Sequence, residues 1–267
     1  MRLAAAETKP TPPLRTRAEV ESILAKASRP SSTRPLNIVL VASEQDHGAG
    51  QHDYPAWQKS WSALLGQAAN VTVTNAWKWP AAQQFEQASV VVFYYWNHEW
   101  TPEVFQQLDA YQARGGGVVL LHSSCIADQD PEALAERIGL ASHPKRSKYR
   151  HGELDLKIIA PPEHPLTSGL PRNIHFLDET YWPMFGETNK VEVLALAAEE
   201  GKDWPMVWTY NRGKSRVFGT LQGHYSWTHD HPFFRILVLR AIAWSAREPV
   251  ARLESLATVG VNFKPEQ

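Results

Sequence analysis

The sequence has a single cysteine, no long apolar run and almost no net charge. One cysteine, Cys125, excludes an intramolecular disulfide framework and a cysteine-rich metal site. No stretch approaches the roughly 20 apolar residues that cross a bilayer, so no membrane span is predicted. With 27 basic and 28 acidic residues, the formal net charge is −1, which leaves no electrostatic field to hold a polyanion. We therefore expect neither a nucleic-acid partner nor a membrane partner.

The two ends of the chain differ in composition from the middle. Residues 1–36 are rich in proline, serine, threonine and charge, which predicts a disordered N-terminal tail with one short amphipathic helix over 18–27. The first residues, MRLAAAETK, resemble the end of an export signal that lacks its apolar segment. The localisation is therefore cytoplasmic for the chain as written, and periplasmic or exported if translation starts upstream. One domain over 37–247 and a C-terminal tail over 248–267 complete the predicted organisation.

Strand and helix patterns alternate through the first half of this domain. Continuous apolar runs predict buried parallel strands over 37–43, 89–96 and 118–121, and a further short strand is predicted over 71–74. Apolar residues at helical spacing predict helices over 55–69, 102–114 and 131–138. The second half has more strands, over 153–159, 191–198, 206–210 and 215–221, and ends in an apolar helix over 231–246. This alternation predicts an α/β fold, a flavodoxin-like doubly wound parallel sheet with a β-rich second half.

Polar side chains collect where the predicted strands end. In open α/β sheets the ligand crevice lies beyond the carboxyl ends of the strands, so the residues just after each strand are site candidates. A further segment, DETY, adds two carboxylates and a tyrosine. The candidates gathered in this way are mainly histidine, carboxylate and hydroxyl residues: Glu44, Asp46, His47, His98, Glu99, His122, Ser123, Ser124, Asp178, Glu179, Tyr181 and His224.

Four motifs in this order resemble the trehalose-utilisation (ThuA-like) family. They are GGGVVLLHSS (115–124), HPLTSGLP (164–171), DETY (178–181) and GTLQGHYSWTHDHPFFR (219–235), and the loop HGAGQHDY (47–54) extends the match. The resemblance covers roughly residues 37–246. It implies a class I glutamine amidotransferase-like fold and a role in the catabolism of sugars or glycosides, often of 3-keto sugars.

His122 stands where amidotransferases place their nucleophile, at the turn between a strand and a helix. A glutaminase needs a cysteine there, flanked by glycine, to form a sharp strained turn. Here the turn reads LHSSC, with no glycine and with Cys125 three residues further on. We therefore exclude glutaminase chemistry and interpret Cys125 as a small buried residue.

The catalytic residues predicted from this pattern are His122, His224 and Glu179. Imidazoles and a carboxylate can serve as general acid and base on opposite sides of a sugar ring. If the DETY segment is extended, Glu179 and Tyr181 share one face and Asp178 lies on the other. His52 and Asp53 precede Pro55 and are interpreted as caps of the next helix. The residues predicted to bind substrate are His47, Tyr181, Asp178, Ser123, Trp96, Glu99 and Trp227.

Each of these candidates also has a purely structural interpretation. His122 could be a buried histidine that caps a helix, and His224 a turn residue. The DETY carboxylates could be solvated acids on a surface strand. Trp96 and Trp227 are among eleven tryptophans, whose flat faces suit either sugar stacking or loop packing.

No cofactor is predicted from local spacing, because no HExxH motif or other close histidine pair stands on a helix. The alternative is a divalent metal such as zinc, held by His47, His122 and His224 with a carboxylate as fourth ligand. The predicted function is a carbohydrate-catabolic enzyme of hydrolase or lyase type, using histidine and carboxylate acid–base chemistry on a sugar or keto-glycoside. A non-catalytic carbohydrate-binding or scaffolding domain is the alternative. The expected partner is a small carbohydrate, and a homo-oligomer is compatible with the sequence.

Overall fold

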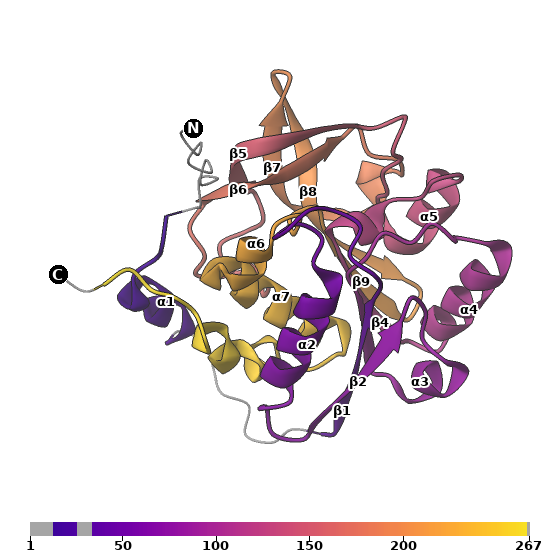
Figure 1. Cartoon of the computed structure of the whole chain (residues 1–267), viewed down its shortest axis with the longest axis horizontal. Helices are drawn as coiled ribbons and strands as arrows, with labels where there is room; N and C mark the ends of the chain where they lie inside the picture. Colours follow the sequence, from indigo (N-terminus) through magenta and orange to yellow (C-terminus); the bar gives the residue numbers. More distant parts are fainter. Residues whose placement is uncertain (1–12, 26–33, 266–267) are drawn as a thin grey trace, which may run out of the picture.

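The structure of the chain, a computed structural model, describes residues 13–25 and 34–265 (Figure 1). The strands are β1 (Leu36–Ala42), β2 (Val71–Trp77), β3 (Val90–Phe93), β4 (Gly117–Leu121), β5 (Lys148–Ile158), β6 (Asn173–Trp182), β7 (Glu192–Glu199), β8 (Lys202–Arg212) and β9 (Ser215–Thr220). The α-helices are α1 (Arg17–Leu24), α2 (Tyr54–Leu65), α3 (Ala82–Gln87), α4 (Pro102–Ala113), α5 (Pro131–Ile138), α6 (Ser226–Asp230) and α7 (Pro232–Ser245). The 3-10 helices are η1 (His122–Cys125), η2 (Thr188–Lys190), η3 (Val250–Arg252) and η4 (Glu254–Thr258).

Five strands form the parallel half of the sheet, in the order β2-β1-β3-β4-β9. Every residue of β3 and β4 is buried, as expected for strands covered by helices on both faces. Helices α2 and α7 cover one face, and α3, α4 and α5 lie on the other (Figure 1). This order and this layering confirm the predicted flavodoxin-like fold.

The β-rich second half continues the same sheet in antiparallel fashion, as β8, β7, β5 and β6. In the register of β5 with β6, His151 lies opposite Glu179 and Tyr149 opposite Tyr181. The sequence analysis placed the start of this strand at residue 153, because Lys148–Gly152 is too polar to show an apolar pattern. It also missed the short helices α3 and α6.

The segments outside the predicted domain are packed against it, so "tail" is the wrong description for their described parts. Val20 and Ile23 of α1 are buried in the core. Arg240 of α7 forms an ion pair with Glu254 at 2.5 Å, and both side chains are buried. Apolar burial therefore holds α1 against the core, and the Arg240–Glu254 ion pair joins η4 to α7. The signal-like first residues and the rest of the predicted N-terminal tail, 1–12 and 26–33, lie outside the described residues.

Among the residues that the structure describes, no helix combines the length and the apolar character that a bilayer crossing requires.

Candidate active site

Strand β4 ends directly at His122, whose backbone is left-handed with a φ of 54°. Such a φ is strained for a non-glycine residue and is typical of sharp turns that present a side chain at a sheet edge. Such a turn was expected only for a glycine-flanked cysteine, but His122 adopts it. Cys125 lies three residues further on, fully buried, and burial raises the pKa of its thiol well above the usual range.

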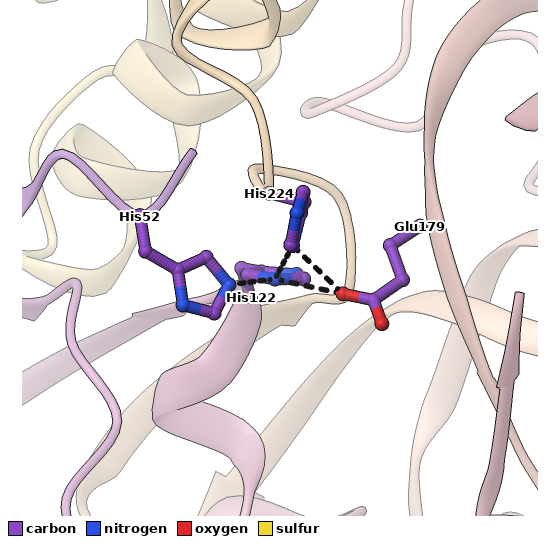
Figure 2. A group of neighbouring side chains, drawn as sticks. All are labelled: His52, His122, Glu179 and His224. Atoms are coloured by element: carbon purple, nitrogen blue, oxygen red, sulfur yellow. Dashed lines mark hydrogen bonds and ion pairs between the residues drawn. The ribbon is translucent and has the colours of Figure 1, made fainter. Parts of the chain in front are cut away.

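Three further side chains reach His122 from distant parts of the chain (Figure 2). His52, from the loop before α2, places its Nε2 2.8 Å from His122 Nε2. His224, from the turn after β9, places its Nδ1 3.3 Å from the same atom. Glu179 of β6 places its Oε2 3.2 Å from His122 Nε2 and 2.9 Å from His224 Nδ1. The three residues predicted to be catalytic therefore meet in one cluster, together with His52.

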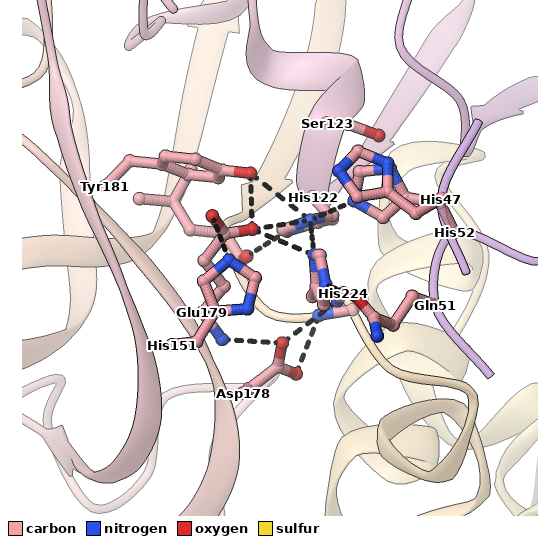
Figure 3. Close-up of polar contacts among 12 residues, drawn as sticks. His47, Gln51, His52, His122, Ser123, His151, Asp178, Glu179, Tyr181 and His224 are labelled. Atoms are coloured by element: carbon pink, nitrogen blue, oxygen red, sulfur yellow. Dashed lines mark hydrogen bonds and ion pairs between the residues drawn. The ribbon is translucent and has the colours of Figure 1, made fainter. Parts of the chain in front are cut away.

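The alternation predicted for β6 is present. Tyr181 donates its hydroxyl to Glu179 Oε2 at 2.7 Å, so both side chains lie on the face toward the cluster (Figure 3). His151 on β5 faces the same carboxylate, with its Nε2 3.2 Å from Glu179 Oε1. Its side chain is 36% exposed, whereas that of Glu179 is only 5% exposed. His151 is therefore the solvent-facing member of the group.

The cluster holds separated charges although it is buried. Burial opposes charge on Glu179, but hydrogen bonds with three histidines outweigh it and hold the pKa of the carboxyl far below its usual range. Burial would also lower the pKa of His122, but its hydrogen bond with Glu179 prevails and raises that pKa. Burial lowers the pKa of His52 to about 3 and the pKa of His224 to about 4. Contact with Glu179 thus favours the charged form of His122, whereas burial favours the neutral forms of His52 and His224.

A cavity of about 480 Å³ opens above this cluster. Its walls combine imidazoles, hydroxyls and aromatic rings with a few apolar groups. The lining residues are His47, His52, Trp96, Ile126, Ser142, His143, Pro144, Ser147, Tyr149, His151, Glu179 and Tyr181. Of the residues predicted to bind substrate, this wall includes His47, Trp96 and Tyr181.

Asp178 lies behind the cluster rather than in the cavity. Its carboxylate accepts hydrogen bonds from the backbone N–H groups of Gly223 and His224, both at 2.9 Å, and from the Thr228 hydroxyl at 2.5 Å. Gly223 has a φ of 130°, and a Cβ there would lie 3.2 Å from the Cβ of His122. Asp178 and Gly223 therefore fix the turn that carries His224, and Asp178 is too buried to contact a substrate.

Three other residues predicted to bind substrate lie outside the cavity. Ser123 is buried, with its Oγ 2.9 Å from the Tyr54 hydroxyl. Trp227 donates to the Leu177 carbonyl at 2.8 Å and lines a separate hollow. Glu99 lines a smaller neighbouring hollow beyond β1 and β3. These placements depend on side-chain directions in loops, which the position of a residue after a strand does not determine.

His52 and His151 are the residues that sequence reasoning missed. Asp53 does cap α2, with its Oδ1 3.2 Å from Ala56 N, but His52 points the opposite way into the cluster. His151 was not predicted because the start of β5 is polar. Tyr149 and His151 are two positions apart, as residues on one face of a strand are.

The four clustered residues could also hold a metal ion. One ligand atom from each of His52, His122, Glu179 and His224 lies within 4.8 Å of every other. His47, predicted above as a possible ligand, does not belong to this set. It forms a second, more exposed group of possible ligands with Asp46 and His52.

Comparison with known proteins agrees with the fold and with the motifs. The family model described as trehalose utilisation (ThuA) matches residues 38–245. No curated protein shows a significant match. A ThuA-like protein from Parabacteroides merdae is 22% identical with a TM-score of 0.64, over 79% of this chain and 90% of the other. A ThuA-like protein from Bacteroides uniformis is 16% identical with a TM-score of 0.64, over 83% and 98%.

A β-galactosidase from Bacillus circulans sp. alkalophilus shares the fold over 80% of this chain but only 32% of its own length. Its identity is 13% and its TM-score 0.55. At these identities the likeness of all three structures concerns the fold alone. The family model is a different kind of evidence, because it matches the sequence itself over most of the chain. The protein therefore belongs to the ThuA family, named for trehalose utilisation, and has a carbohydrate-related role.

Proposed function

We propose that this protein is an enzyme that acts on a sugar or keto-glycoside in the cavity above Glu179. The observation that carries the proposal is the buried, ionised Glu179 carboxylate at the floor of an open cavity, in contact with His122, His151 and His224. Buried charges destabilise a fold unless they are fully paired, and they concentrate at functional sites. A purely structural or binding role does not require such a group.

The size and the walls of the cavity suit a small carbohydrate. Ligand pockets for small molecules have volumes of roughly 300–1,000 Å³, and this cavity has about 480 Å³. Trp96 and Tyr149 offer flat apolar faces for a sugar ring, while Ser147 and His143 offer polar groups for its hydroxyls. Family membership supports the same substrate class.

The pocket-facing groups can carry the protons in this proposal. His122 and His224 are almost completely buried and do not line the cavity. The proton transfers first assigned to His122 and His224 therefore pass to His151 and Tyr181, which line the cavity and contact Glu179. A base and an acid so placed can remove a proton next to a sugar carbonyl and protonate the leaving glycosidic oxygen. Together these two steps are an elimination, which is lyase chemistry, and addition of water to the unsaturated product would complete a hydrolysis.

A product screen tests the proposal. Purified protein is incubated with keto-glycosides and their parent sugars, and products are followed by liquid chromatography and by NMR in D₂O. We expect turnover of a keto-glycoside, reduced by roughly 10²-fold or more in the Glu179→Gln and His151→Gln variants. The matched control is Glu153→Gln, an exposed carboxylate on the neighbouring strand, which should keep full turnover.

The same experiment separates an enzyme from a binding module. Saturable quenching of tryptophan fluorescence by a sugar, with no product and no deuterium incorporation for any substrate, would favour the carbohydrate-binding domain instead. Equal turnover in the Glu179→Gln and Glu153→Gln variants would place the chemistry elsewhere.

A further inference from the structure

Three imidazole nitrogens and one carboxylate oxygen face a common centre in this site (Figure 2). His122 Nε2 lies 2.8 Å from His52 Nε2 and 3.3 Å from His224 Nδ1. Glu179 Oε2 lies 3.2 Å from His122 Nε2 and 2.9 Å from His224 Nδ1. Four side chains from four separate segments thus direct their polar atoms at one small volume.

Each of the three imidazoles has its other ring nitrogen bound to a hydrogen-bond acceptor. These pairs are His122 Nδ1 with the Leu221 carbonyl at 2.7 Å, His224 Nε2 with Gln51 Oε1 at 3.0 Å, and His52 Nδ1 with Asp46 Oδ1 at 2.6 Å. A carbonyl or carboxylate oxygen only accepts, so the outer nitrogens carry the protons. In a neutral imidazole the inner nitrogen then presents a lone pair to the centre.

Four acceptor atoms at these separations repel one another unless positive charge lies between them. The hydroxyl hydrogen of Tyr181, which lies 2.7 Å from Glu179 Oε2 and 3.3 Å from His122 Nε2, supplies partial positive charge but can be donated to only one of these atoms at a time. A cation that binds all four atoms satisfies the whole set. Tetrahedral zinc with bonds of about 2.0–2.1 Å holds its ligand atoms about 3.3 Å apart. Four of the six separations are 2.8–3.3 Å, close to that value, and all six are within 4.8 Å.

We propose that His52, His122, His224 and Glu179 bind a divalent first-row transition metal, for which zinc is the best fit. Three imidazole donors and one carboxylate suit zinc, whereas magnesium and calcium prefer oxygen ligands throughout. The outer partners of the histidines fix tautomer and ring direction, as the outer partners of metal ligands do.

This inference rests on the proposed function only for the role of the metal in catalysis. Its test measures metal binding and does not depend on that function. A zinc-type ion at the floor of the cavity would polarise a carbonyl or hydroxyl oxygen of the sugar by accepting it as a fifth ligand. His151 and Tyr181 remain outside the ligand set and free to transfer protons. His47 also lies outside the set. It comes from the same loop as His52, and its ring is 36% exposed, so it provides a matched control.

The test is metal titration of the whole protein. Protein stripped with a chelator is titrated with Co²⁺, which reports its coordination through visible absorption, and bound Co²⁺ is then displaced with Zn²⁺. We expect one ion per chain, the strong absorption of a four- or five-coordinate site, and complete displacement by zinc. Circular dichroism is used to check that the stripped protein is folded.

Variants assign the ligands. Glu179→Gln and His224→Gln should each weaken cobalt binding by about 10²-fold or more, and His47→Gln by less than about tenfold. The wild-type titration decides the question even if a variant fails to fold. Folded wild type that binds no stoichiometric ion, or a His47→Gln variant that loses as much affinity as His224→Gln, would overturn the inference. Metal binding without sugar turnover would contradict only the proposed function, whereas turnover by a protein that binds no stoichiometric ion in the titration would contradict only the metal site.

Discussion

Two groups of buried histidines in this protein have opposite surroundings. His122 and His224 lie against the Glu179 carboxylate, whereas His229 and His231 lie among aromatic rings at the start of α7. Both ring nitrogens of His231, and Nδ1 of His229, lack a hydrogen-bond partner among the described residues. Burial lowers the pKa of His229 and His231 to about 3, whereas contact with Glu179 raises the pKa of His122.

The difference shows that burial by itself keeps an imidazole neutral and inert. A buried histidine needs a carboxylate partner to stay protonated, and a charged group beside a cavity can take part in acid–base catalysis. His224 also contacts Glu179, but burial prevails there and lowers its pKa to about 4, so the balance between burial and partner decides the charge of each histidine. Variants of residues in and around the two groups test this contrast.

The largest effect is expected for Glu179 and His151, which form one working unit. Each of Glu179→Gln and His151→Gln should reduce turnover by roughly 10²-fold or more, and the double variant should lose little beyond the worse single one. The measurement is steady-state kinetics of all three variants on one substrate. His231→Leu, in the aromatic group, should leave turnover unchanged. Fully additive losses would show that the two residues act independently.

The next largest effect concerns Asp178, which joins the two groups by holding the turn of His224 and the hydroxyl of Thr228. Asp178→Asn replaces an accepting oxygen by a donor, which leaves buried N–H groups without a partner. We expect a loss of about 2–4 kcal/mol in the free energy of unfolding, measured by urea denaturation. The exposed Asp155→Asn, on neighbouring β5, should change stability by less than about 0.5 kcal/mol. Equal effects of both substitutions would contradict the role given to Asp178.

A smaller effect is expected for acid stability through His231. Its pKa of about 3 in the folded protein lies below the 6.5 of an ordinary histidine, so the unfolded chain binds more protons as the pH falls. Stability that is complete above pH 6.5 is then lost as the pH falls toward 3, by up to about 1.4 kcal/mol per pH unit for this residue.

The His231→Leu variant should lose stability less steeply than wild type between pH 6 and pH 4. Urea unfolding at a series of pH values measures both slopes. Identical slopes would mean that His231 is as easily protonated in the folded protein as in the unfolded one.

The smallest effect is expected for Cys125→Ser. Cys125 shares the 3-10 helix η1 with His122, but its thiol is buried and burial raises its pKa. A thiol that stays protonated is a poor nucleophile, so turnover should change by less than about threefold. If turnover collapsed in a variant that melts near the wild-type temperature, Cys125 would be a candidate catalytic nucleophile.

Much of the fold could be predicted because its determinants are local. Apolar runs such as 37–43 and 118–121 predicted the buried parallel strands that are observed as β1 and β4. Two-residue alternation in the DETY segment predicted that Glu179 and Tyr181 share a face and that Asp178 does not, and their contacts agree. The topology rule for strand ends brought His122 and His224 to one edge, and their ring nitrogens lie 3.3 Å apart. The catalytic and metal-binding roles of these residues remain predictions.

Composition and the order of the motifs thus determined the α/β class, the ThuA family and three members of the cluster. The tertiary structure alone decided the rest. In the tertiary structure, His52 rather than His47 contacts His122. The β5–β6 register puts His151 opposite Glu179. Trp227 and Glu99 lie outside the cavity. Periodic burial follows from neighbouring residues, whereas register and loop direction depend on contacts between segments far apart in the chain. Those contacts determine which side chains meet.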